Sequence, residues 1–182
     1  MSTLEVNSIQ PLSSGSTITL GASGKTLSIP SGCTITNSGT ATGFGKVGQI
    51  VQASTTTEVS NTTTSYADTG LTASITPTST SSKILVTVHQ NGARSQSDQN
   101  NNCIYLKLLR DSTDISQIFV YALYTGSGID LYGASLSTSF LDSPSTTSAT
   151  TYKTQFKNFV SGGHVRLQDT QAMSTITLME IL

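Results

Sequence analysis

The feature that most limits the possible folds is the alternation of apolar and polar residues in short segments across residues 46–182. In Lys83–His89, for example, every second residue from Ile84 to Val88 is β-branched and apolar, which suits one face of a strand. No segment has a convincing helical period. The alternation predicts nine strands: Gln49–Ala53, Leu71–Thr76, Lys83–Gln90, Cys103–Arg110, Ser116–Tyr124, Gly133–Leu141, Thr150–Asn158, His164–Gln168 and Ser174–Ile181.

Turn-rich spacers separate these strands at the spacing of an all-β sandwich, and we predict a jelly-roll-like head. Composition agrees with this prediction. Roughly a third of the residues are Ser or Thr, and only 10% are charged. Disordered chains are usually rich in charge and poor in apolar groups, so the low charge favours a folded domain.

Residues 1–45 have a different pattern, in which Ser16–Leu20 is echoed by Lys25–Ile29 and by Cys33–Thr36. Such short strands cannot bury a core within one chain. Stacked repeats of a single chain would solve this, and so would three chains winding about a common axis. We favour the trimer, with a β-repeat stalk at 1–45 and the head at 46–182. The predicted subunit contacts in the stalk are Ile18, Leu20, Leu27, Ile29 and Ile35.

The last strand is apolar on both faces towards its end, which implies burial between sheets or against another subunit. We predict that Ile176, Leu178 and Ile181 also contribute to a subunit contact of a homotrimer.

The motifs of enzymes and metal sites are weak. Gly43–Gly48 matches the dinucleotide fingerprint, but a β-like segment follows it where a helix is needed, so a flexible joint is predicted. His89 and His164 lie in none of the spacings that bind metals. A single His per chain on a three-fold axis remains an alternative. No carboxylate pair stands out as a glycosidase site, and we expect no catalytic activity, cofactor or metal.

Two features suit ligand binding. The polar loop Ser95–Asn102 carries amide side chains that can donate to and accept from sugar hydroxyls, with Gln96, Asp98, Asn100, Asn101 and Asn102 as candidate receptor contacts. A simple connecting turn is the alternative. The aromatic residues of the head could form a sugar-stacking platform, or they could be core and subunit contacts: Tyr105, Phe119, Tyr121, Tyr124 and Tyr132.

Several partners are not expected. The nine Lys and Arg residues are scattered and the net charge is −1, which argues against nucleic acid. No apolar run approaches the roughly 20 residues of a membrane span, and no signal peptide is recognisable. The sequon at Asn61 is therefore expected to be unused. Cys33 and Cys103 are interpreted as buried free thiols, with a single disulfide between them as the alternative.

Four parts of the chain are similar to known sequences: Met1–Gln10, Leu27–Gly45, the start of the head from Val47–Gln52 through Tyr66–Leu71, and Ile176–Ile181. They resemble tail-fibre and other virion proteins of tailed bacteriophages of marine and fresh waters, including cyanophages.

The resemblance implies a thread-like trimer that is made in the host cytoplasm and built into the virion. Residues 1–15 would attach to a tail or capsid protein, with Leu4, Val6 and Ile9 as candidate contacts. The loops Gln96–Asn102 and Ser143–Ala149 would contact a host surface glycan or protein. The leading expectation is a tail fibre. A capsid-bound decoration or head-fibre protein is the alternative, and a small depolymerase would need a carboxylate pair in a groove.

Overall fold

The computed structural model describes residues 31, 47–96, 99–126 and 128–182. The chain divides into two compact units, Met1–Gly43 and Phe44–Leu182, and nearly all described residues belong to the second unit. The predicted stalk and attachment residues, and Cys33, lie outside the described residues: Leu4, Val6, Ile9, Ile18, Leu20, Leu27, Ile29 and Ile35.

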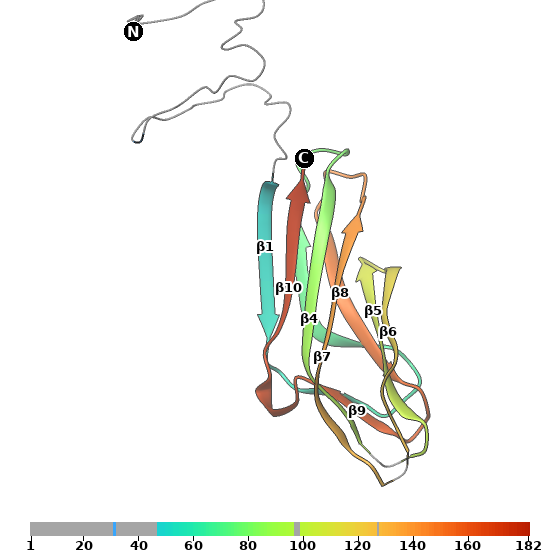
Figure 1. Cartoon of the computed structure of the whole chain (residues 1–182). Coiled ribbons are helices and arrows are strands. Elements are labelled where there is room, and N and C mark those ends of the chain that lie inside the picture. The colour runs from blue at the N-terminus through green and yellow to red at the C-terminus, as the bar shows by residue number, and fades with distance from the viewer. Residues whose placement is uncertain (1–30, 32–46, 97–98, 127) are drawn as a thin grey trace, which may run out of the picture. The chain divides into compact units, whose positions relative to one another are not determined.

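The described residues form ten strands and one short 3-10 helix (Figure 1). All nine predicted strands are present, and two of them, Thr150–Asn158 and Ser174–Ile181, agree at both ends. The elements are β1 (Val47–Thr55), β2 (Val59–Asn61), β3 (Ala67–Ile75), β4 (Lys83–Gln96), β5 (Asn102–Arg110), β6 (Thr113–Thr125), β7 (Leu131–Asp142), β8 (Thr150–Asn158), β9 (His164–Leu167), η1 (Asp169–Gln171) and β10 (Ser174–Ile181).

The strands lie in two facing sheets, which confirms the prediction of an all-β sandwich. One sheet has the order β1-β10-β4-β7, continued by the short strands β9 and β2, and the other has the order β3-β8-β5-β6. Every pairing is antiparallel. The first long strand pairs with the last, and the chain crosses repeatedly between the layers. This strand order is that of a jelly roll.

The central strand β4 joins the two halves of its sheet. It pairs with β10 along residues 83–89 and with β9 along 94–96, while β7 pairs with its other side. Between β9 and β10 the chain leaves the sheet and forms η1. Opposite this excursion lies Gly92, with a φ of 60°. A Cβ atom there would lie 2.6 Å from the backbone nitrogen of Asp169, so only glycine fits.

The interior has two hydrophobic clusters with a layer of buried polar side chains between them. One cluster includes Val88, Tyr152 and Ile176, and the other includes Ala93 and Phe156. The polar layer consists of Thr69, Gln90, Thr154, Gln168 and Ser174, all without solvent exposure.

Gln90 is the centre of this layer. Its amide nitrogen donates to the Ser174 hydroxyl at 3.1 Å, and its carbonyl oxygen accepts from the Thr154 hydroxyl at 3.0 Å. Thr154 and Thr69 share a hydrogen bond of 2.6 Å. The hydrogen bonds of Gln90, Ser174, Thr154 and Thr69 thus connect β4 and β10 of one sheet to β8 and β3 of the other.

Two expectations need correction. Ile176 and Leu178 are completely buried within the chain, where they face the second sheet, so they offer no surface to another subunit. Only Ile181, of the three apolar residues predicted there as contacts, is partly exposed. Strand β2 lies in a stretch predicted as a spacer, because three residues are too few to show alternation.

A buried carboxylate, that of Glu180, stabilises the end of the domain where β1 begins and β10 ends. The Glu180 side chain accepts from the Gln49 amide at 2.8 Å and from the Thr78 backbone N–H at 2.6 Å. Burial alone raises the pKa of Glu180, but the hydrogen bonds from Gln49 and Thr78 outweigh it and lower the pKa to about 2.

The first prediction concerns the polar layer. Replacing Gln90 by Ala leaves Thr154 and Ser174 short of a partner and opens a cavity, so we expect a loss of at least about 2 kcal/mol in the free energy of unfolding. Thr147→Ala, in an exposed loop, is the control and should change it by less than about 0.5 kcal/mol. Urea denaturation measures both. Equal stability of the two variants would contradict a structural role for the layer.

The second prediction concerns acid. Because the pKa of Glu180 is below its ordinary value in the folded state, its ionised carboxylate stabilises the fold at neutral pH. That contribution should be lost as the pH falls from about 4.5 towards about 2. Glu180→Gln lacks this titration but keeps the other acidic groups. The stability difference between wild type and variant should therefore shrink over that range, and a constant difference would disprove the assignment.

Candidate functional site

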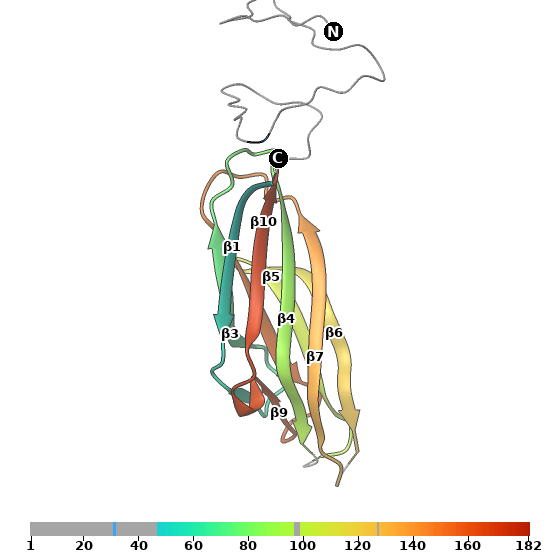
Figure 2. The same cartoon turned by 60° about the vertical axis from the view of Figure 1, so that its left-hand side comes forward.

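Three turns meet at the end of the domain opposite to Val47 and Leu182 (Figure 2). They connect β4 to β5, β6 to β7, and β8 to β9. Gly126 lies near the Asn100 side chain, and Gly162 lies near the Gln99 side chain, so the three turns form one continuous surface. We call this end of the domain the distal end.

The loop Gln96–Asn102, predicted to contact a receptor and called the receptor loop below, is at the distal end, and its residues have different environments. Asn100 and Asn101 are exposed, and Asp98 lies outside the described residues. Gln96 is the last residue of β4 and is partly buried. Asn102 is completely buried and donates to the backbone oxygens of Gln96 and His164. Asn102 therefore supports the loop from beneath, and its predicted role as a receptor contact is corrected.

The second predicted loop, Ser143–Ala149, lies at the other end of the sandwich. Asp142, the residue before it, pairs with Ile84, and Ile84 pairs with Glu180 near the end of the chain. The two loops proposed as receptor contacts are thus separated by the length of the β4 strand and cannot form one site.

Beside the receptor loop lies a cluster of four aromatic rings, which we call the aromatic surface: Tyr105, Tyr121, Tyr124 and Phe159. The Tyr105 and Phe159 rings are stacked with centroids 5.7 Å apart. Tyr121 meets both of these rings edge-on at 5.2 Å. The Tyr121 and Tyr124 side chains are 51% and 53% exposed, which is unusual for large rings that contact one another.

An irregular edge strand produces this surface. Four residues of β6, from Phe119 to Ala122, lie opposite only three residues of β5, from Ile104 to Leu106. Tyr121 and Leu123 have left-handed φ values of 55° and 51°. The bulge breaks the alternation, so Phe119 packs against the core while Tyr121 faces solvent. Phe119 and Tyr121 therefore lie on opposite sides of the strand, although a regular strand places residues two apart on the same face.

The aromatic surface has polar neighbours. The Tyr124 hydroxyl donates to the Asn101 side-chain oxygen, which joins the rings to the receptor loop. The Lys157 ammonium lies 5.2 Å from the Tyr105 ring centroid. Burial and a hydrogen bond with Tyr121 raise the pKa of Tyr105, so its hydroxyl stays protonated. Flat rings beside amides and an ammonium can hold the apolar face and the hydroxyls of a sugar.

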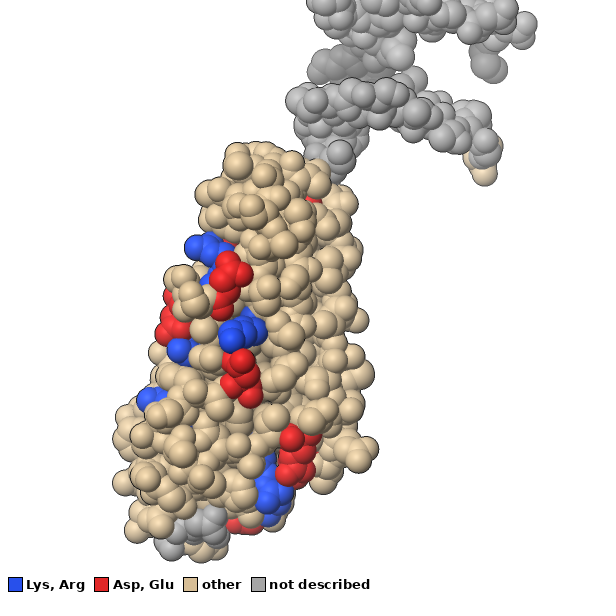
Figure 3. All heavy atoms as spheres, turned by 180° about the vertical axis from the view of Figure 1, so that it is seen from behind, with Lys and Arg blue, Asp and Glu red and all other residues tan. Residues whose placement is uncertain are grey.

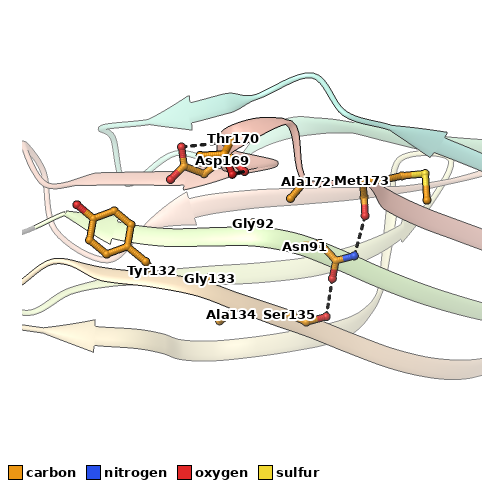
Figure 4. A pocket seen from close by; sticks show the side chains of 10 residues that line it. All are labelled: Asn91, Gly92, Tyr132, Gly133, Ala134, Ser135, Asp169, Thr170, Ala172 and Met173. Carbon is orange, nitrogen blue, oxygen red and sulfur yellow. Dashed lines mark hydrogen bonds between the residues drawn. The ribbon is translucent and has the colours of Figure 1, made fainter.

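A separate depression of about 420 Å³ lies on the other sheet, at the excursion between β9 and β10 (Figure 4). Tyr132 forms one side, Asp169 and Thr170 form the other, and Gly92 and Gly133 lie between them. Its volume is within the range of small-ligand sites. The predicted aromatic platform thus divides, because Tyr132 belongs to this depression and not to the aromatic surface.

Charged groups border the depression in a closed arrangement. The Arg94 guanidinium pairs with Asp130 at 2.9 Å, lies 3.7 Å from Asp169, and stacks over the Tyr132 ring at 4.2 Å. The Tyr132 hydroxyl accepts from Arg94 and donates to Asp130. Both carboxylates are therefore next to the same guanidinium.

The wall of the depression is strained. Gln168, Thr170 and Gln171 all have left-handed φ values, between 55° and 63°. Each such residue costs on the order of 1 kcal/mol and persists only where the surroundings fix it. Gln168 is held by its hydrogen bond to Ser174 within the buried polar layer.

The remaining motifs acquire plain structural explanations. Val47 and Gly48 of the apparent dinucleotide fingerprint belong to β1, not to a helix. Asn61 of the sequon is buried, and its amide donates to backbone oxygens of Ser65 and Phe156. Cys103 is a buried free thiol whose pKa is raised by burial to about 11. The part of the chain that the structure describes has no cluster of metal-binding side chains and no helix suited to spanning a membrane.

No protein-family model and no curated protein sequence matches this chain. Several solved structures align with it, among them two from infectious bursal disease virus that do so at low similarity. The VP2 subviral particle of infectious bursal disease virus has 12% identity and a TM-score of 0.38, covering 80% of this chain and 37% of that chain. Infectious bursal disease virus, Gt strain, has 10% identity and a TM-score of 0.35, covering 81% and 42%. The chain spans about two fifths of these proteins, and similarity at this level supports no conclusion about function.

Proposed function

We propose that the chain is a non-enzymatic structural protein of a bacteriophage virion, a homotrimeric tail fibre whose head binds a glycan of the host surface. The aromatic surface beside the receptor loop is the observation that carries the proposal. Tyr121 and Tyr124 offer exposed rings for stacking, and Asn100 and Asn101 lie next to them. The resemblance of the sequence to phage tail-fibre proteins is the second support.

The position of the aromatic surface suits this function. The chain enters the domain at Val47, and Val47 pairs with Ile181 at the end opposite to the receptor loop. A protein attached to a virion through residues 1–15 would therefore present the distal end outward. Binding by one such shallow surface is expected to be weak, and multiple heads would raise the overall affinity.

The charged groups favour binding over catalysis. Glycoside hydrolysis uses two carboxyl groups that flank the scissile bond. The two carboxylates that border the depression, Asp130 and Asp169, both lie against Arg94. The depression is thus better suited to holding a ligand than to cleaving one.

The third prediction tests the binding site on an array of bacterial lipopolysaccharide and capsular saccharides. The purified full-length chain should bind at least one saccharide. Tyr121→Ala and Tyr124→Ala should each weaken that binding about tenfold, which corresponds to about 1.4 kcal/mol.

Tyr132→Ala is the matched control, because it removes an equally exposed tyrosine from the other sheet. It should leave the affinity unchanged. If Tyr132→Ala abolishes binding while the other two variants bind normally, the site is the depression and the assignment to the aromatic surface is wrong. Absence of binding to every saccharide would overturn glycan recognition.

A further inference from the structure

The two outer faces of the sandwich differ sharply in charge. Over the sheet β3-β8-β5-β6 lie the ion pairs Lys107–Asp114 and Lys153–Asp68 together with Lys157, and Figure 3 shows basic and acidic side chains gathered on this face. The opposite face is formed by the outward-pointing residues of β4 from Lys83 to Asn91 and by the residues of β10, β1 and β7 that lie in the same rows. Lys83 is the one charged side chain among them. We call this second surface the uncharged face.

Four apolar residues form a continuous row across the uncharged face. Ile50 of β1 pairs with Met179 of β10, Met179 pairs with Leu85 of β4, and Leu85 pairs with Leu141 of β7. Because adjacent strands are about 4.8 Å apart, the row spans about 14 Å. Its two ends are wide open, since Ile50 is 58% exposed and Leu141 is 50% exposed. We call these residues the apolar row.

The neighbouring rows are polar but satisfied within the face. The Gln52 amide donates to the Thr177 hydroxyl at 2.9 Å, and Thr87 shares a hydrogen bond with Ser139 at 3.3 Å. In the next row, His89 and Ser137 are 3.0 Å apart. Covering polar groups that already have partners costs much less than covering groups that lose their bonds to water. These three pairs therefore oppose the covering of the face less than unpaired polar side chains would.

We propose that the uncharged face is the surface through which heads of this chain associate with one another. An interface core is depleted in charge and contains apolar groups, and both properties are present here. A second copy of the same face brings one charged side chain, Lys83, at the start of β4, and therefore little charge that would repel the first. The proposal rests on the oligomeric part of the proposed function and does not depend on glycan binding.

The chain outside the described residues supports a second copy as the occupant. The 46 residues before the domain are bonded to Val47, which pairs with Ile181 at the edge next to the apolar row. Copies that associate through this row bring the starting points of their N-terminal segments together. The short alternating repeats of those segments are the kind that need neighbouring chains to bury their apolar residues.

The fourth prediction concerns the mass of the full-length chain in solution, measured by light scattering after size exclusion. Wild type should have a multiple of the 19.0 kDa chain mass. Leu141→Glu places a carboxylate in the apolar row and should weaken association at least tenfold. Val120→Glu is the matched control, since Val120 is 51% exposed on the other sheet, and it should leave the mass unchanged.

Several results would overturn the proposal. One is a wild-type mass of 19.0 kDa, which would also be observed if the chain's own N-terminal segment covered the face. The other is an equal mass for wild type and Leu141→Glu. If Leu141→Glu fails to fold, as judged by circular dichroism, Ser139→Lys replaces it, because Ser139 is exposed in the next row. If the chain is a monomer in solution but the glycan proposal is correct, the monomer should still bind saccharide, with lower avidity.

Discussion

The hydrogen bonds of one buried amide, Gln90, connect the parts of this domain that matter for its function. They join the central strand β4 to β10 and to the opposite sheet, and they separate the two hydrophobic clusters. Ser174, the partner of Gln90, also accepts from Gln168 and so fixes the strained excursion that forms the depression. A polar layer of this kind has few alternative arrangements that satisfy every group, so it defines the register between the sheets.

Alternation was enough to predict the sandwich, because a strand buried on one face repeats every two residues whatever its partners. It failed where the backbone departs from the regular strand. The left-handed residues Tyr121 and Leu123 turn Phe119 inward and Tyr121 outward, and no pattern in the sequence indicates them. Burial of Asn102 depends on the distant oxygen of His164, which only the folded chain brings close. The sequence equally gives no sign that Ile50 and Leu141 lie in one row, with Met179 and Leu85 between them.

The surfaces of the domain suggest a division of tasks. Ion pairs lie on the outer face of one sheet, and the aromatic surface lies at the distal end of that sheet. The other sheet has little charge and an exposed apolar row near the chain termini. A head that associates through the second sheet keeps the aromatic surface free for a ligand. Association and ligand binding would then depend on separate surfaces of the domain.

Radical footprinting of the full-length chain, read by mass spectrometry, tests this division most directly. Met179 lies in the apolar row, whereas Met173 is 56% exposed beside the depression. We expect Met179 to be oxidised more slowly in the associated wild-type protein than in the Leu141→Glu variant. Met173, Tyr121 and Tyr124 should be oxidised freely in both proteins. Oxidation of Met179 at the same rate in both proteins, or protection of the two tyrosines without any ligand, would contradict the account.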